Sequence, residues 1–257
     1  MGELAYIAAG FSVGTIIGLT GVGGGSLMTP LLIFFFGVKP YLAVGTDLLF
    51  AAFTKMGGTL SFSRQGLVPW RVVGLLSAGS LPAALLTLWA LHTVGPTRPE
   101  VQTLMTSALG VALLLTACAM MFKALRSRQL SGQRTRPVIR HWSGSVLLGA
   151  VIGTLVTLTS VGAGAIGVSV LLLLYPLLPL PRIVAADIAY AVPLTLVAGL
   201  GHASLGSVDW PLLALLLTGS LPGIWLGSRL TRHAPERLVR SLLSLLLAWA
   251  GIKLVLI

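Results

Sequence analysis

The stretch GVGGGSLMTP, residues 21–30, places three consecutive glycines inside an apolar part of the chain, and SVGAGAIGVS, residues 160–169, repeats the pattern. Val22 aligns with Val161 at a spacing of 161 − 22 = 139 residues, and the glycines after Val22 align with Gly162, Ala163 and Gly164. Glycine in a helix interior costs about 1 kcal/mol relative to alanine. The two breaks therefore predict two interrupted helices at matching places.

Other motifs repeat with nearly the same spacing. LSFSRQGLVPW, which ends at Trp70, matches LGHASLGSVDW, which ends at Trp210, and the sequence GSLP occurs at both 79–82 and 219–222. Both pairs are separated by 140 residues, so the second copy has gained one residue. We interpret the two halves of the chain as diverged copies of one unit.

Composition indicates a membrane protein. The 257 residues are 56% hydrophobic and only 9% charged, with a mean hydropathy of +0.97, whereas soluble domains have about 25% charged residues. Apolar segments recur along the whole chain, which predicts one all-α polytopic membrane domain over residues 1–257. The expected segments are 4–20, 26–37, 41–63, 69–91, 100–122, 143–160, 166–178, 182–204, 210–230 and 236–257.

The two segments that follow the glycine breaks, 26–37 and 166–178, are too short to cross a bilayer, which takes about 20 residues. Each half is therefore expected to be a glycine-broken helical hairpin followed by three transmembrane helices. Five segments per half is an odd number, so the second repeat (143–257) would be inverted relative to the first (3–122). Small-residue ladders such as Gly10/Gly14 and Gly149/Gly153 favour close helix crossings.

The net charge of +11 comes largely from one segment, since the linker 123–142 has six basic residues and no acid. Placing this linker in the cytoplasm puts thirteen basic residues inside and only Lys39, Arg98 and Lys253 outside, as the positive-inside rule expects. Both termini then lie outside. A loop of this kind explains the charge without a nucleic-acid partner.

The glycine breaks are candidate anion sites. A helix that starts after an unwound segment presents free N–H groups and the positive end of its dipole. Inverted symmetry would bring two such starts together, so the candidate substrate-binding residues are Gly23, Gly24, Gly25 and Ser26 with Gly162, Ala163, Gly164 and Ala165. The alternative is that the glycines serve only tight helix crossing.

Three charged residues fall inside expected spans: Asp47 and Lys55 in 41–63, and Asp187 in 182–204. Asp187 matches Asp47 at 187 − 47 = 140, whereas Lys55 matches Thr195. Charges at membrane depth face a partner or a polar cavity. Lys55 is a candidate substrate ligand, Thr46 and Thr195 candidate hydroxyl donors, and Asp47 or Asp187 the carrier of a coupling proton. A structural ion pair is the alternative for all three charges, and His202 is interpreted as an interfacial residue.

The sequence contains no convincing motif for nucleotide binding, metal-dependent proteolysis or serine hydrolysis. The run Gly162-x-Gly164-x-x-Gly167 formally fits a dinucleotide fingerprint, but no strand precedes it. The chain has no Walker A, H-E-x-x-H or G-x-S-x-G sequence, and Cys118 is its only cysteine. We therefore expect no enzyme, no cofactor and no metal. Paired broken helices in two repeats are typical of secondary transporters, whose site lies between the repeats.

The chain resembles the sulfite exporter TauE/SafE family of bacterial inner-membrane transporters. The elements that match are GLTGVGGGSLMTPLL, AVGTDLLFAAFTKMGG and SRQGLVPWR in the first half, and SVGAGAIG, HASLGSVDW and GSLPGIWLGSRL in the second. The resemblance implies multi-pass insertion in the cell inner membrane and ion-coupled export of a small sulfur-containing anion, sulfite or an organosulfonate. Some relatives import, and the chain has Pro69 where the family often has an aspartate, as at Asp209.

The alternatives to an exporter are a passive anion channel, an importer of a related organosulfur compound, and an enzyme or membrane subunit of a larger complex. The expected partners are a small anion and the lipid bilayer, and oligomerisation is left open.

Overall fold

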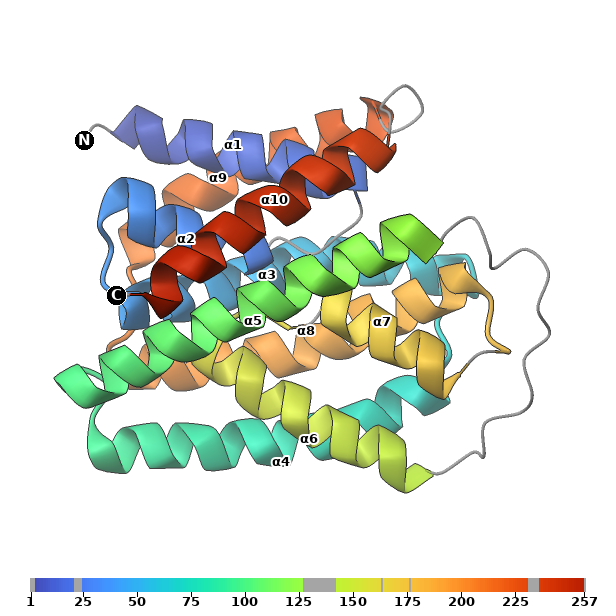
Figure 1. Cartoon of the computed structure of the whole chain (residues 1–257), viewed down its shortest axis with the longest axis horizontal. Coiled ribbons are helices and arrows are strands. Elements are labelled where there is room, and N and C mark those ends of the chain that lie inside the picture. Colours follow the sequence, from blue (N-terminus) through green and yellow to red (C-terminus); the bar gives the residue numbers. More distant parts are fainter. Residues whose placement is uncertain are drawn as a thin grey trace.

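The computed structural model describes residues 3–20, 25–126, 142–162, 164–175, 177–230 and 236–256. Within these residues every regular element is an α-helix (Figure 1). The helices of the first half are α1 (Glu3–Thr20), α2 (Gly25–Phe36), α3 (Pro40–Arg64), α4 (Trp70–Val94) and α5 (Pro99–Arg126). Those of the second half are α6 (Trp142–Thr159), α7 (Ala165–Leu174), α8 (Leu180–Ser204), α9 (Trp210–Leu230) and α10 (Glu236–Val255).

The predicted all-α class is confirmed, and each expected segment corresponds to one helix. Helix boundaries follow local chemistry: Pro40 and Pro99 are the first residues of α3 and α5, where a missing N–H costs no hydrogen bond. Gly66 and Gly206 follow α3 and α8 with φ angles of +66° and +68°, a conformation that glycine adopts without strain. These two glycines occupy equivalent places in the repeated sequence.

The packing partners of the first half recur in the second. Helix α1 packs mainly on α9 and α6 mainly on α4, whereas α3 packs on α8 and α5 on α10. If each helix is exchanged for its counterpart in the other half, these four main pairs map onto one another. The inverted relation of the two repeats in a bilayer stays a prediction.

Glycines bring the α1–α9 and α6–α4 pairs close together. A Cβ built on Gly14 would lie 2.7 Å from Cα of Ser220 in α9, and one on Gly153 would lie 2.7 Å from Cα of Ser80 in α4. The equivalent contacts of Gly10 and Gly149 are with the backbones of Leu216 and Leu76. No side chain fits between these backbones, as expected for small-residue crossings.

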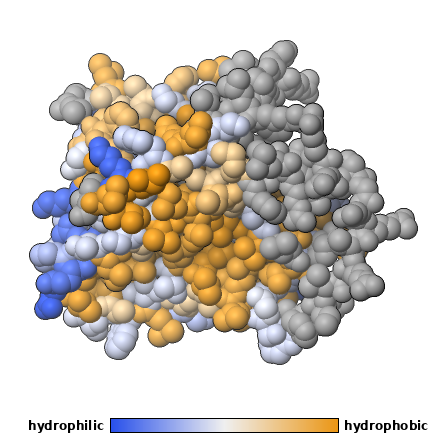
Figure 2. All heavy atoms as spheres, in the orientation of Figure 1, coloured by the Kyte–Doolittle hydropathy of each residue, from blue (hydrophilic) through white to orange (hydrophobic). Residues whose placement is uncertain are grey.

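The helices run roughly along one common direction (Figure 1). The marked N- and C-termini lie at one end, here called the terminal end, and α5 ends and α6 begins at the other, here called the linker end. Figure 2 shows apolar side chains over the middle of one face and hydrophilic side chains gathered at the terminal end. This distribution suits a protein whose middle lies in hydrocarbon.

Five of the described helical segments are long and apolar enough to cross a membrane, and they lie in α4, α5, α6, α8 and α9. Helix α3 has 25 residues but is not among them, since Asp47 and Lys55 interrupt its apolar sequence. It is instead shielded by protein, because Ala43 to Ala52 are all buried. The protein is a multi-pass membrane protein, and the N-terminal half of α3 carries Asp47 into its interior.

Candidate functional site

The three charged residues that the sequence places at membrane depth are all buried. Asp47 is 0% exposed, Asp187 2% and Lys55 7%. Asp47 and Lys55 lie on α3 and Asp187 on α8, and these two helices pack against each other. The fold thus brings charges from both halves of the chain into its interior.

The Lys55 ammonium interacts electrostatically with Asp187 and, less strongly, with Asp47. Lys55 follows Asp47 by eight positions, about 12 Å along a helix. The carboxylate that acts more strongly on Lys55 is therefore that of Asp187, on the other helix. With every group ionised, one lysine and two aspartates sum to 1 − 2 = −1. A buried cluster with an excess charge is costly unless a proton or another ion balances it.

Asp47 is held by the short helix α2. The Thr29 hydroxyl donates a hydrogen bond to Oδ2 of Asp47, and both residues are fully buried. The Ser160 side chain, from the second glycine break, lies beside the same carboxylate. Thr29 and Ser160 are the hydrogen-bonding neighbours of this buried carboxylate. Asp47 is therefore surrounded by side chains that follow the first glycine break and open the second.

Asp187 is seated against the short helix α7. Oδ1 of Asp187 occupies the space that a Cβ on Gly167 would need. The Tyr190 hydroxyl would lie 3.2 Å from such a Cβ. Tyr190 is fully buried. It follows Asp187 by three residues on α8, which places both side chains on one face of the helix. The third glycine of the false dinucleotide fingerprint thus makes room for the carboxylate.

The second glycine break has an irregular backbone. Ser160 has a φ angle of +59°, and Gly162 and Gly164 have φ angles of +135° and +134°. Helix α7 starts directly afterwards at Ala165, and the Gly167 N–H donates to the Gly162 carbonyl at 3.2 Å. This bond occupies one of the free amides expected at the helix start.

The first glycine break is described only from Gly25 onward, as the first residue of α2. Gly23, Gly24 and Ala163 lie outside the described residues. For Ser26 and Ala165 the structure describes the backbone, which is helical. Anion binding by these glycine-rich segments stays a prediction.

The two threonines predicted to bind the substrate make other hydrogen bonds. Thr46 Oγ1 accepts a bond of 3.0 Å from the Asp209 N–H, and Asp209 in turn accepts one from the Leu212 N–H at the start of α9. Thr195 Oγ1 donates to the Ala191 carbonyl of its own helix at 2.8 Å. Thr46 therefore fixes the α8–α9 turn to α3, and substrate contacts of both hydroxyls stay predictions.

Sequence reasoning missed Thr29, Ser160, Gly167 and Tyr190. Tyr190 could have been found from its spacing of three from Asp187. Thr29 and Gly167 lie in the short helices after the breaks, but only the fold shows which carboxylate each one faces. His202, expected at the interface, is instead fully buried with its Nε2 atom 2.9 Å from the Thr157 carbonyl oxygen.

Comparisons with known proteins point to a family of membrane transporters. The family model described as Sulfite exporter TauE/SafE matches residues 6–254. The probable membrane transporter protein YjnA of Bacillus subtilis is 36% identical over 255 residues, which cover 98% of this chain and all of that protein. The probable membrane transporter protein YdhB of the same organism is 25% identical and covers 95% of this chain and 96% of its own.

A more distant relative, a probable membrane transporter protein of Xylella fastidiosa, is 23% identical over 88% of this chain and 84% of its own. No solved structure matches the chain.

Proposed function

The chain belongs to the sulfite exporter TauE/SafE family, and on this premise we propose that it is a secondary transporter that exports a small sulfur-containing anion across the bacterial inner membrane. The cargo would be sulfite or an organosulfonate, and transport would be coupled to an ion gradient. The observation that carries the proposal is the buried Lys55, which interacts with carboxylates from both halves of the chain.

Lys55 is the residue proposed to bind the anion. It is the one cation in this cluster, and a lysine in a low-dielectric interior attracts an anion strongly. The amides of both glycine breaks would supply further donors, from Gly23, Gly24, Gly25 and Ser26 and from Gly162, Ala163, Gly164 and Ala165. Ser160 and Gly167 place the second of these breaks beside Asp47 and Asp187.

Asp47 and Asp187 are the residues proposed to carry the coupling proton. The cluster has a formal charge of −1, so an anion bound at Lys55 adds to the excess negative charge. A proton bound to either carboxylate changes the charge in the opposite sense. Anion binding and proton binding thus change the net charge of the same buried cluster. The affinity for the anion therefore depends on whether the proton is bound, and the reverse.

The proposal is tested by flux in proteoliposomes. Purified protein would be reconstituted, and uptake of labelled sulfite or of an organosulfonate would be measured with and without an imposed pH gradient. We expect saturable flux that changes several-fold with the gradient, whereas protein-free liposomes show neither. Flux that ignores the gradient would contradict coupling and indicate a passive channel, and absence of flux for every sulfur-containing anion tested would refute the substrate class.

A further inference from the structure

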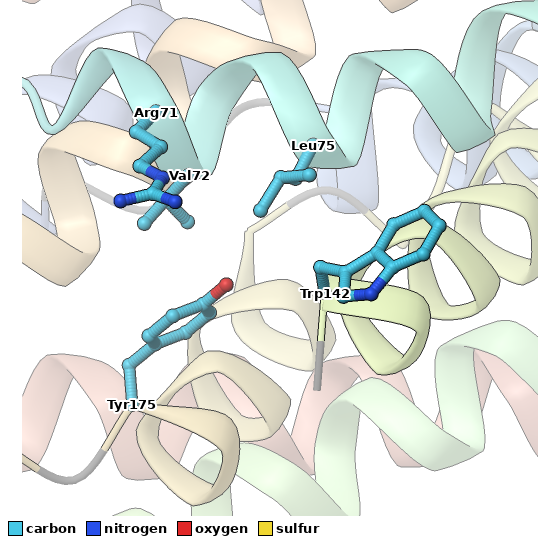
Figure 3. Close-up of a pocket in the computed structure, with 5 residues that line it drawn as sticks. All are labelled: Arg71, Val72, Leu75, Trp142 and Tyr175. Atoms are coloured by element: carbon cyan, nitrogen blue, oxygen red, sulfur yellow. The ribbon is translucent and has the colours of Figure 1, made fainter. Parts of the chain in front are cut away.

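A cavity lies at the linker end, apart from the buried charges. It has a volume of about 280 Å³ and is lined by Arg71, Val72 and Leu75 of α4, Trp142 at the start of α6, and Tyr175 directly after α7 (Figure 3). Figure 3 shows Arg71 and Tyr175 on facing sides of this space. The volume is at the small end of ligand cavities, which suits a small organic anion.

The two repeats differ at Tyr175, which lines the cavity, and at the residue that Tyr175 contacts. Ser145 and Tyr175 align with Tyr6 and Phe36 at a spacing of 139, because 145 − 6 and 175 − 36 both equal 139. The rings of Tyr6 and Phe36 pack with their centroids 4.7 Å apart. In the second half, Ser145 replaces the large ring and its hydroxyl lies 2.5 Å from the Tyr175 hydroxyl. The second repeat thus has a pair of hydroxyl groups where the first has two packed rings.

The side chains that line the cavity favour the binding of an oxyanion. Arg71 provides a guanidinium, which binds sulfonate, sulfate or phosphate oxygens through two parallel N–H groups. Trp142 adds an indole N–H, and Tyr175 adds a hydroxyl. None of the described lining residues is acidic. At the equivalent place of the other repeat, the counterpart of Arg71 is Pro211, at a spacing of 140.

Helix α7 connects this cavity to the buried charges. Its first turn contains Gly167, which contacts Asp187, and its last residue precedes Tyr175 in the cavity wall. Eight residues separate Gly167 from Tyr175, about 12 Å along a helix. One short element thus touches both places.

We propose that this cavity is a loading site, in which Arg71, Trp142 and Tyr175 bind the oxyanion cargo at the linker end before it reaches Lys55. The inference rests on the proposed function for the identity of the cargo. An anionic lipid headgroup has the same oxyanion chemistry, so the test must separate these two sources.

The first experiment measures binding where the buried site has lost its lysine. Methanesulfonate would be titrated into purified Lys55→Met protein, and quenching of Trp142 fluorescence would be followed, with Trp142→Phe to identify that signal. We expect saturable quenching whose affinity falls about tenfold with Arg71→Gln and is lost with Leu75→Phe, which adds volume at the cavity wall. Arg64→Gln is the matched control, since Arg64 is an exposed arginine that does not line the cavity.

Quenching that persists unchanged in Arg71→Gln, or that methanesulfonate never produces, overturns the loading site. The same protein would also be placed in nanodiscs with and without phosphatidylglycerol. Quenching that requires this lipid and does not respond to methanesulfonate assigns the cavity to lipid and overturns the loading site as well. The proposed function is tested separately by flux. Wild-type protein that shows no sulfonate flux contradicts the function, and the quenching assay then still tests whether the cavity binds an oxyanion.

The second experiment keeps Lys55 in place. In vesicles that expose the linker end, Arg71→Gln should raise the KM for methanesulfonate about tenfold and leave the maximal rate unchanged. Arg64→Gln should change neither. An unchanged KM in Arg71→Gln contradicts the proposal even if the Lys55→Met protein proves too unstable to purify.

Discussion

At the scale of single residues, the decisive question is whether Lys55 serves the substrate or only a structural ion pair. A lysine at the centre of a membrane helix costs about 2.5–3.5 kcal/mol on insertion scales. Asp187 and Asp47 both interact with it, so removing the lysine alone strands negative charge. Substrate binding and structural pairing predict different effects of a Lys55 substitution on anion affinity and on thermal stability.

We expect Lys55→Met to weaken sulfite or sulfonate binding at least tenfold, because a charge-assisted contact of about 1.5–3 kcal/mol is lost. If a fixed pair with Asp187 also stabilises the fold, thermal stability will fall, and Lys55→Met combined with Asp187→Asn will recover stability without recovering transport. Melting temperature and anion affinity would be measured together, with Lys39→Met as control, since Lys39 is an exposed residue just before α3. Lost stability with unchanged affinity would assign Lys55 to a structural role only.

At the scale of helices, the close crossings should tolerate no side chain at the matched glycines. A Cβ on Gly153 would lie 2.7 Å from Cα of Ser80, whereas one on Gly74, also helical, would have no atom within 4 Å. Overpacking typically costs about 1–3 kcal/mol, while Gly→Ala at an open helical position is neutral or stabilising by up to about 1 kcal/mol.

We therefore expect Gly153→Ala to lower the melting temperature of the detergent-solubilised protein and Gly74→Ala to leave it unchanged or raise it. Gly14→Ala, at the matching crossing of α1 with α9, should behave like Gly153→Ala. Equal melting temperatures for Gly153→Ala and Gly74→Ala would show that α4 and α6 adjust easily and that the crossing is not a tight one.

The helices could be predicted from sequence because their signals are local. Pro40, Pro99, Gly66 and Gly206 mark ends by backbone geometry alone, and the glycine breaks mark the starts of α2 and α7. The surroundings of the charges could not be predicted in this way. That Thr29 faces Asp47, or that Gly167 faces Asp187, depends on how helices distant in sequence pack. The linker-end cavity could not be predicted either, since Arg71, Trp142 and Tyr175 meet only through the packing of α4, α6 and α7.

At the scale of the whole molecule, the arrangement of helices sets which side of the membrane each turn faces. The α3–α4 turn, with the exposed Gln65, and the α4–α5 turn, with the exposed Thr97, are separated by the single 25-residue helix α4. A helix of 25 residues is about 37 Å long, enough to cross a hydrocarbon core of about 30 Å. The two turns therefore belong on opposite sides.

The excess of basic residues assigns the sides. Two arginines, Arg64 and Arg71, flank the α3–α4 turn, whereas only Arg98 lies at the α4–α5 turn. The positive-inside rule therefore places Gln65 in the cytoplasm. In a Cys118→Ser background, Gln65→Cys should react with a membrane-impermeant maleimide only in inside-out vesicles, and Thr97→Cys only in intact cells. Permeabilised cells, in which both cysteines should react, control for access. Labelling of both positions from the same side would refute the crossing of α4. Labelling of each position from the opposite side to the one expected would reverse the orientation of the protein. The linker end would then lie outside the cell, and the proposed loading site would be an external one.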